Sequence, residues 1–141
     1  MPARSARAVG VAGARAGIAA LALGAAAVVA GAAPAGAHAT LIGTAPAADG
    51  VVEAVPDRVE LRFDEPVETV EGAVQVFGPD GDRVDGGSVE TADGGATLRA
   101  PIAADAQGTY TVAWRVTSED GHTLSGSFVF HNGTRTGAVD L

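Results

Sequence analysis

The fold class is decided by two stretches, TYTVAWRVT at Thr109–Thr117 and LSGSFVFH at Leu124–His131. In an extended chain, every second side chain lies on the same face. One face of the first stretch carries only apolar and aromatic side chains, which predicts a strand packed against a core. These core candidates are Tyr110, Val112, Trp114 and Val116.

Shorter runs with the same alternation precede these two stretches and are separated by Gly, Pro and Asp. Together with the two long runs they give about seven strands, and no convincing amphipathic helix accompanies them. We expect no more than a helical turn at Pro101–Gln107. The sequence therefore predicts an all-β, antiparallel sandwich or barrel. The shorter expected strands are His38–Thr44, Val59–Phe63, Ala73–Phe77, Arg83–Val84, Val89–Thr91 and Ala96–Arg99.

The first 37 residues have a different composition, with 17 alanines, three arginines and no acid. The arginines precede an apolar run over residues 16–33, and Ala35-Gly36-Ala37 follows it. This order is typical of a secretory signal peptide, here residues 1–37 with cleavage after Ala37. A retained transmembrane anchor is the alternative, because the run reaches about the minimum length for spanning. Cleavage would make His38 the first residue of the mature chain.

Residues 38–141 contain all seventeen acids and only six arginines, which gives this part a formal charge of −11. Such a charge argues against nucleic-acid binding and favours cationic partners, metal ions among them. The absence of Cys excludes a disulfide scaffold, a thiolate metal site and a Cys nucleophile. These 104 residues suit one small domain, which we expect to be monomeric, soluble and secreted or otherwise extracytoplasmic.

The best candidates for a metal site are His38, Asp120 and His122. A His at the N-terminus offers its imidazole and its α-amine to one ion, and such an amine ordinarily has a pKa of about 8. Asp120 and His122 are two residues apart, so in extended backbone they project from the same face. Three nitrogens and one carboxylate oxygen, without sulfur, suit Cu(II).

Simpler interpretations of the same residues remain open. Asp-Gly is a common turn dipeptide, so Glu119–His122 can be a plain connection between the two long strands. His38 would lie at a chain terminus, which often frays. The third histidine, His131, ends an apolar run with no partner ligand nearby in sequence, so we interpret it as a structural or surface residue. No motif for a nucleophilic serine surrounds Ser118.

Six segments, taken together, resemble the CopC family of copper-resistance proteins in order and spacing over residues 38–131. The resemblance implies a Greek-key β-sandwich of cupredoxin-like or immunoglobulin-like form for residues 38–141. The segments are His38–Leu41 (HATL), Thr44–Gly50 (TAPAADG), Val59–Val67 (VELRFDEPV), Gly108–Trp114 (GTYTVAW), Val116–His122 (VTSEDGH) and Gly126–Phe128 (GSF).

The resemblance also implies a function, namely binding of one Cu(II) per mature chain by the amine and imidazole of His38 with Asp120 and His122. Glu65 matches a family position beside the site, where it would orient the ligands through hydrogen bonds. The sole methionine is Met1, so the Met-rich Cu(I) site of some members is missing. By this resemblance, the protein is not an enzyme but buffers copper or delivers it to a CopD-type membrane transporter.

Two other functional classes stay open at this point. A copper enzyme that oxidises polysaccharides would also use an N-terminal histidine. The small domain, its single Trp and single Tyr, and a carboxylate as third side-chain ligand argue against that enzyme. A metal-free extracellular sandwich used for adhesion is the remaining alternative.

Overall fold

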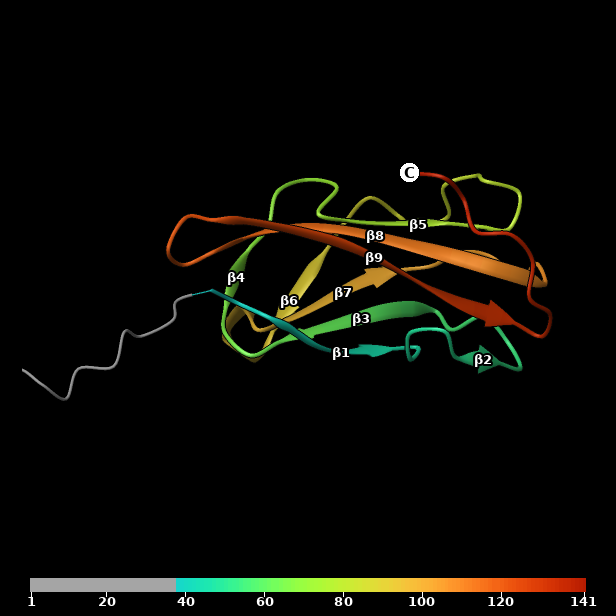
Figure 1. Cartoon of the computed structure of the whole chain (residues 1–141), viewed down its shortest axis with the longest axis horizontal. Coiled ribbons are helices and arrows are strands. Elements are labelled where there is room, and N and C mark those ends of the chain that lie inside the picture. Colours follow the sequence, from blue (N-terminus) through green and yellow to red (C-terminus); the bar gives the residue numbers. More distant parts are fainter. Residues whose placement is uncertain (1–37) are drawn as a thin grey trace, which may run out of the picture. The chain divides into compact units, whose positions relative to one another are not determined.

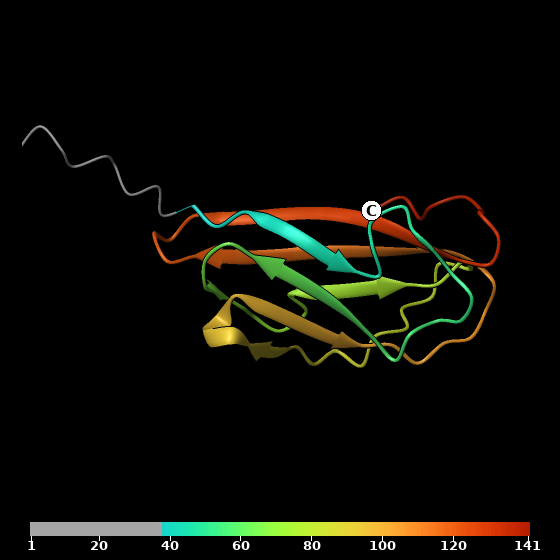
Figure 2. The same cartoon turned by 90° about the horizontal axis from the view of Figure 1, so that it is seen from below.

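The computed structural model describes residues 38–141, and the predicted signal peptide lies outside the described residues. Two β-sheets face each other in this part of the chain (Figures 1 and 2). One has the strand order β1-β3-β7-β6, and the other has the order β2-β9-β8-β4, with β5 also paired to β8. The strands are β1 (Leu41–Ala45), β2 (Val51–Val52), β3 (Arg58–Phe63), β4 (Val67–Glu68), β5 (Val74–Phe77), β6 (Glu90–Ala92), β7 (Thr97–Pro101), β8 (Gly108–Ser118) and β9 (Thr123–Asn132).

The two long predicted strands are confirmed as β8 and β9, which run side by side along the domain (Figure 1). Their antiparallel register is continuous from Gly108↔Asn132 to Thr117↔Thr123. The turn between them consists of residues 119–122. The connection that the Asp-Gly dipeptide predicts is therefore present.

The core lies between the sheets and includes the predicted face of β8. Tyr110, Val112 and Val116 are buried, while Trp114 is half-buried and packs its ring edge-to-face on Phe63 with 5.5 Å between centroids. Each large apolar side chain buried in this way contributes about 1.5–3 kcal/mol. The facing sheet contributes Val59, Leu61, Phe63, Leu98 and Ala100, and the sheet of β8 adds Val67, Val74, Val76 and Phe130.

Gly126 of β9 lies directly opposite Trp114 of β8. A Cβ at this glycine would be 2.7 Å from Cζ2 of the indole ring, closer than real side-chain contacts allow. The ring therefore occupies the space that a side chain at position 126 would need.

The described residues form nine strands rather than about seven, and one pairing is parallel. β2 and β4 have two residues each, too few to show an alternating pattern. β2 pairs with β9 in parallel, Val51 opposite His131, so this sheet is mixed. The expected helical turn at Pro101–Gln107 is absent, and a 3₁₀ turn forms at Asp93–Gly95 instead. No helix in residues 38–141 has the length and apolarity to cross a membrane.

Candidate metal centre

The segment that carries His38 is held to the end of β3. The side chain of Ala39 is buried in the core. The Thr40 N–H donates to Oδ1 of Asp64 at 2.6 Å, and the Asp64 N–H donates to the Thr40 carbonyl at 3.0 Å. These contacts begin one residue after His38 and oppose the fraying expected of a chain terminus. Spacing in the sequence did not indicate Asp64, because it lies 24 residues from Thr40.

The β8–β9 turn presents Asp120 and His122. The Ser118 N–H donates to the His122 carbonyl at 2.9 Å, and the Gly121 N–H donates to the Ser118 carbonyl at 2.9 Å. Gly121 has φ +83°, a left-handed conformation that favours glycine. The backbone is thus bent rather than extended, and the same-face argument does not apply. The turn itself brings the two side chains together.

The three predicted ligands converge on one carboxylate oxygen. Oδ2 of Asp120 is 2.6 Å from Nδ1 of His38 and 3.0 Å from Nδ1 of His122. The two imidazoles meet edge-to-face with 4.8 Å between ring centroids. One potential ligand atom from each residue lies within 4.8 Å of the others. The three residues are therefore close enough together to be candidates for holding one metal ion.

The site is open and carries a stable negative charge. The side chains of His38 and His122 are 63% and 67% exposed, and that of Asp120 is 21% exposed. The hydroxyl of Ser118 donates to Oδ1 of Asp120. This hydrogen bond, with those from His122, lowers the pKa of Asp120 to about 2 although partial desolvation opposes the shift. Asp120 is therefore a carboxylate anion at neutral pH.

Glu65 is half-buried beside Asp64, which binds the N-terminal segment. In the described part of the chain, Glu65 takes part in none of the side-chain hydrogen bonds or ion pairs that link the site residues. Its role as a hydrogen-bond partner of the ligands stays a prediction. The sequence indicated no role for Ser118 beyond that of a possible nucleophile, although its spacing of two residues from Asp120 could have indicated the contact.

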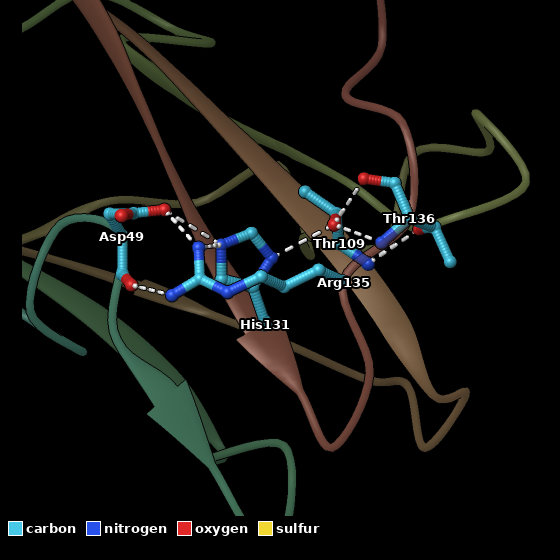
Figure 3. A network of polar contacts seen from close by, with 5 residues as sticks. All are labelled: Asp49, Thr109, His131, Arg135 and Thr136. Carbon is cyan, nitrogen blue, oxygen red and sulfur yellow. Dashed lines mark hydrogen bonds and ion pairs between the residues drawn. The ribbon is translucent and has the colours of Figure 1, made fainter.

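His131 lies near the other end of β9, roughly 25 Å along the strand from Thr123. It is buried, with Nδ1 at 2.9 Å from Oγ1 of Thr109 and Nε2 at 3.0 Å from Oδ1 of Asp49 (Figure 3). Arg135 places Nη1 at 3.0 Å from the same Nε2. His131 therefore belongs to an internal polar network and is separate from the three candidate ligands.

Comparison with known proteins identifies relatives that are similar in sequence. Protein YobA of Escherichia coli K12 is 34% identical over 87 residues, which is 60% of this chain and 70% of YobA. Copper transport protein CutJ of Bacillus subtilis is 30% identical over 102 residues, which is 69% of this chain. The match covers only 18% of CutJ, so it concerns one part of a larger protein.

Solved structures share the fold. CopC from Methylosinus trichosporium OB3b superimposes with a TM-score of 0.58 at 29% identity, over 73% of this chain and 100% of that one. PcoC, a methionine-rich copper resistance protein from Escherichia coli, gives 0.54 at 26% identity over 67% of this chain and 98% of PcoC. The CopC domain family matches residues 41–133, more than half of the sequence. The chain therefore belongs to the CopC family, as its sequence motifs indicated.

Proposed function

We propose that this protein binds one Cu(II) per mature chain outside the cytoplasm, as a monomeric copper-binding protein of copper homeostasis. The ligands are His38, Asp120 and His122. The observation that carries the proposal is the convergence of two exposed imidazoles on a single oxygen of Asp120.

The donor set supports copper as the metal. Imidazole nitrogens bind Cu(II), Ni(II) and Zn(II), and among these Cu(II) forms the most stable complexes with a given nitrogen and oxygen site. Cu(I) prefers thiolate and thioether ligands, and residues 38–141 contain neither Cys nor Met. This separates the chain from PcoC, a methionine-rich protein. A site for Cu(II) alone fits these residues best.

Cleavage after Ala37 would add a fourth donor to this set. The α-amine of His38 belongs to the same residue as one imidazole ligand, so the two nitrogens would close a chelate ring on one ion. The formal charge of −11 on residues 38–141 would raise the local concentration of cations without selecting among them. Selectivity would come from the three nitrogens and one oxygen.

The exposure of the site supports a role in buffering or transfer. Both histidine side chains are more than half exposed, so an acceptor protein could approach the ion without a large rearrangement. We propose a CopD-type membrane copper transporter as the acceptor, and a non-enzymatic role for the protein. A pull-down of copper-loaded protein with such a transporter in membranes, compared with copper-free protein, would test the transfer step.

The binding proposal is tested on protein secreted by its own leader. Intact mass and N-terminal sequencing should show a chain that begins at His38. Titration against a competing chelator should then show one tightly bound Cu(II) per monomer. A variant with one extra glycine before His38 should bind more than about 100-fold more weakly, since even outer-shell partners contribute 10–100-fold.

A chain with one extra glycine after Leu141 is the matched control, because it has the same added mass at a terminus without ligands. Equal copper affinity of both extended chains would show that the amine is not a ligand. Absence of tight Cu(II) binding in the secreted protein itself would overturn the proposed function.

A further inference from the structure

We propose that Ser118 is a positioning residue that restricts Asp120 to a single metal-binding oxygen. This inference rests on the proposed function and extends it to a residue that does not touch the metal. Ser118 would act by holding Oδ1 of Asp120, which leaves Oδ2 alone facing His38 and His122.

Ser118 is well placed for this role because its own position is fixed. It is the last residue of β8 and is only 2% exposed. Its backbone N–H donates to the His122 carbonyl at 2.9 Å on one side. On the other side it pairs in register with Val67 of β4. Because two neighbouring segments hold its backbone, Ser118 loses less further conformational entropy when its hydroxyl binds the carboxylate.

The single hydroxyl hydrogen of Ser118 has two acceptors within reach. One is Oδ1 of Asp120, and the other is the His122 carbonyl at 3.1 Å. That carbonyl already accepts the Ser118 N–H, whereas a carboxylate oxygen is the stronger acceptor. We therefore assign the hydrogen to Oδ1.

Oδ1 of Asp120 has a second donor, the His122 N–H at 3.2 Å. The two carboxylate oxygens thus have separate roles, since Oδ1 accepts from the turn and Oδ2 faces both imidazoles. A carboxylate held in this way offers one oxygen to an ion and does not rotate to offer two. Hard cations such as Ca²⁺ need six to eight oxygen ligands, so the restriction favours a nitrogen-rich copper site.

The test compares S118A with wild type in chains that begin at His38. We expect S118A to bind Cu(II) about 10–100-fold more weakly, the usual effect of losing an outer-shell partner. The Cu(II) electron paramagnetic resonance spectrum should also change, because Asp120 could then rotate. S118T keeps the hydroxyl and should match wild type in both measurements. S125A removes a hydroxyl from an exposed position on the same hairpin and is the matched control.

A double-mutant cycle with D120A separates positioning from a general structural effect. If Ser118 acts through Asp120, S118A should change neither affinity nor spectrum in the D120A background, where the nitrogens of His38 and His122 still bind copper. An S118A variant with wild-type affinity and spectrum would overturn the inference, as would an S118A effect that persists with D120A. Failure of the wild-type chain to bind Cu(II) would instead overturn the proposed function, and this inference with it.

Discussion

The β8–β9 hairpin has a cluster of histidine and aspartate near each of its ends, and the two clusters differ in what surrounds them. At the turn, Asp120 faces two exposed imidazoles, His38 and His122. At the opposite end, Asp49 faces the buried imidazole of His131 and the guanidinium of Arg135, whose Nη1 is 2.6 Å from Oδ1 (Figure 3). The first carboxylate has no arginine partner among the described residues, whereas the second is already paired with a permanent cation.

The hydrogen bonds of the second cluster give it a structural role, which is to hold the C-terminal segment on β8. We call this cluster the clamp. Thr109 Oγ1 donates to the Thr136 carbonyl at 2.8 Å and accepts the Thr136 N–H at 2.8 Å. It must then accept from Nδ1 of His131, which therefore carries a proton. These bonds fasten the C-terminal segment to β8, and no buried side-chain nitrogen or oxygen in the described residues lacks a hydrogen-bond partner. Both ends thus pair an aspartate with histidine. At one end the imidazole is buried and the carboxylate is paired with Arg135, which makes the cluster a clamp, whereas at the other end the imidazoles are exposed and the site is open.

The largest difference in copper affinity should appear when the carboxylate charge is removed from one end or from the other. D120N should weaken Cu(II) binding by more than about 100-fold, because a ligand contributes more than its outer-shell partners. D49N changes the other carboxylate and should leave copper affinity at the wild-type value. Competition titration of chains beginning at His38 measures both. Equal losses in the two variants would mean that the clusters are coupled, contrary to the comparison.

The next effect concerns the clamp. T109V keeps the shape of a buried side chain but removes the hydroxyl shared by His131 and Thr136. Because buried polar groups lose their partners, we expect the free energy of unfolding to fall by about 2–3 kcal/mol. Urea unfolding of the metal-free chain measures this, and copper affinity should not change. Unaltered stability would show that the network contributes no net stabilisation.

A smaller loss of copper affinity is expected from a change at Asp64, which holds the N-terminal segment. D64A removes the acceptor of the Thr40 N–H and should weaken Cu(II) binding about fivefold, in line with about 1 kcal/mol for one ordinary hydrogen bond. D64N retains an oxygen acceptor and is the control. E65Q, titrated in parallel, tests whether the neighbouring acid also contributes. An affinity loss in E65Q but not in D64A would assign the role to Glu65.

The smallest effect concerns how the thermal stability of the metal-free protein depends on pH through Asp120. The pKa of Asp120 is lowered from 3.8 to about 2, first by the Ser118 hydroxyl. The resulting stabilisation is fully present above pH 4 and is lost as the pH falls through about 2. The difference in Tm between wild type and D120N should therefore shrink between pH 4 and pH 2. A constant difference over this range would contradict the lowered pKa.

The sequence alone was sufficient for the features that depend on local pattern. Alternation predicted β8, β9 and the burial of Tyr110. The three residues selected as metal ligands lie close together in the structure, and their binding of a metal stays a prediction. Most of the missed features depend on contacts between distant segments, although the missed contact of Ser118 with Asp120 is local. The parallel pairing of β2 has two residues and no period, and Asp49 is 82 residues from His131. Such pairings arise only when the sheets assemble, so no local spacing indicates them.

The close approach of Trp114 to Gly126 has a consequence for the turn at residues 119–122. A shift of the β8–β9 pairing by one residue would place Ser125 or Ser127 opposite the indole ring, where a Cβ has no room. The bulky ring thus excludes the wrong alignments of the hairpin. By excluding other alignments, the ring also fixes which residues form the turn. The contact of Trp114 with Gly126 therefore helps to place Asp120 and His122 in that turn.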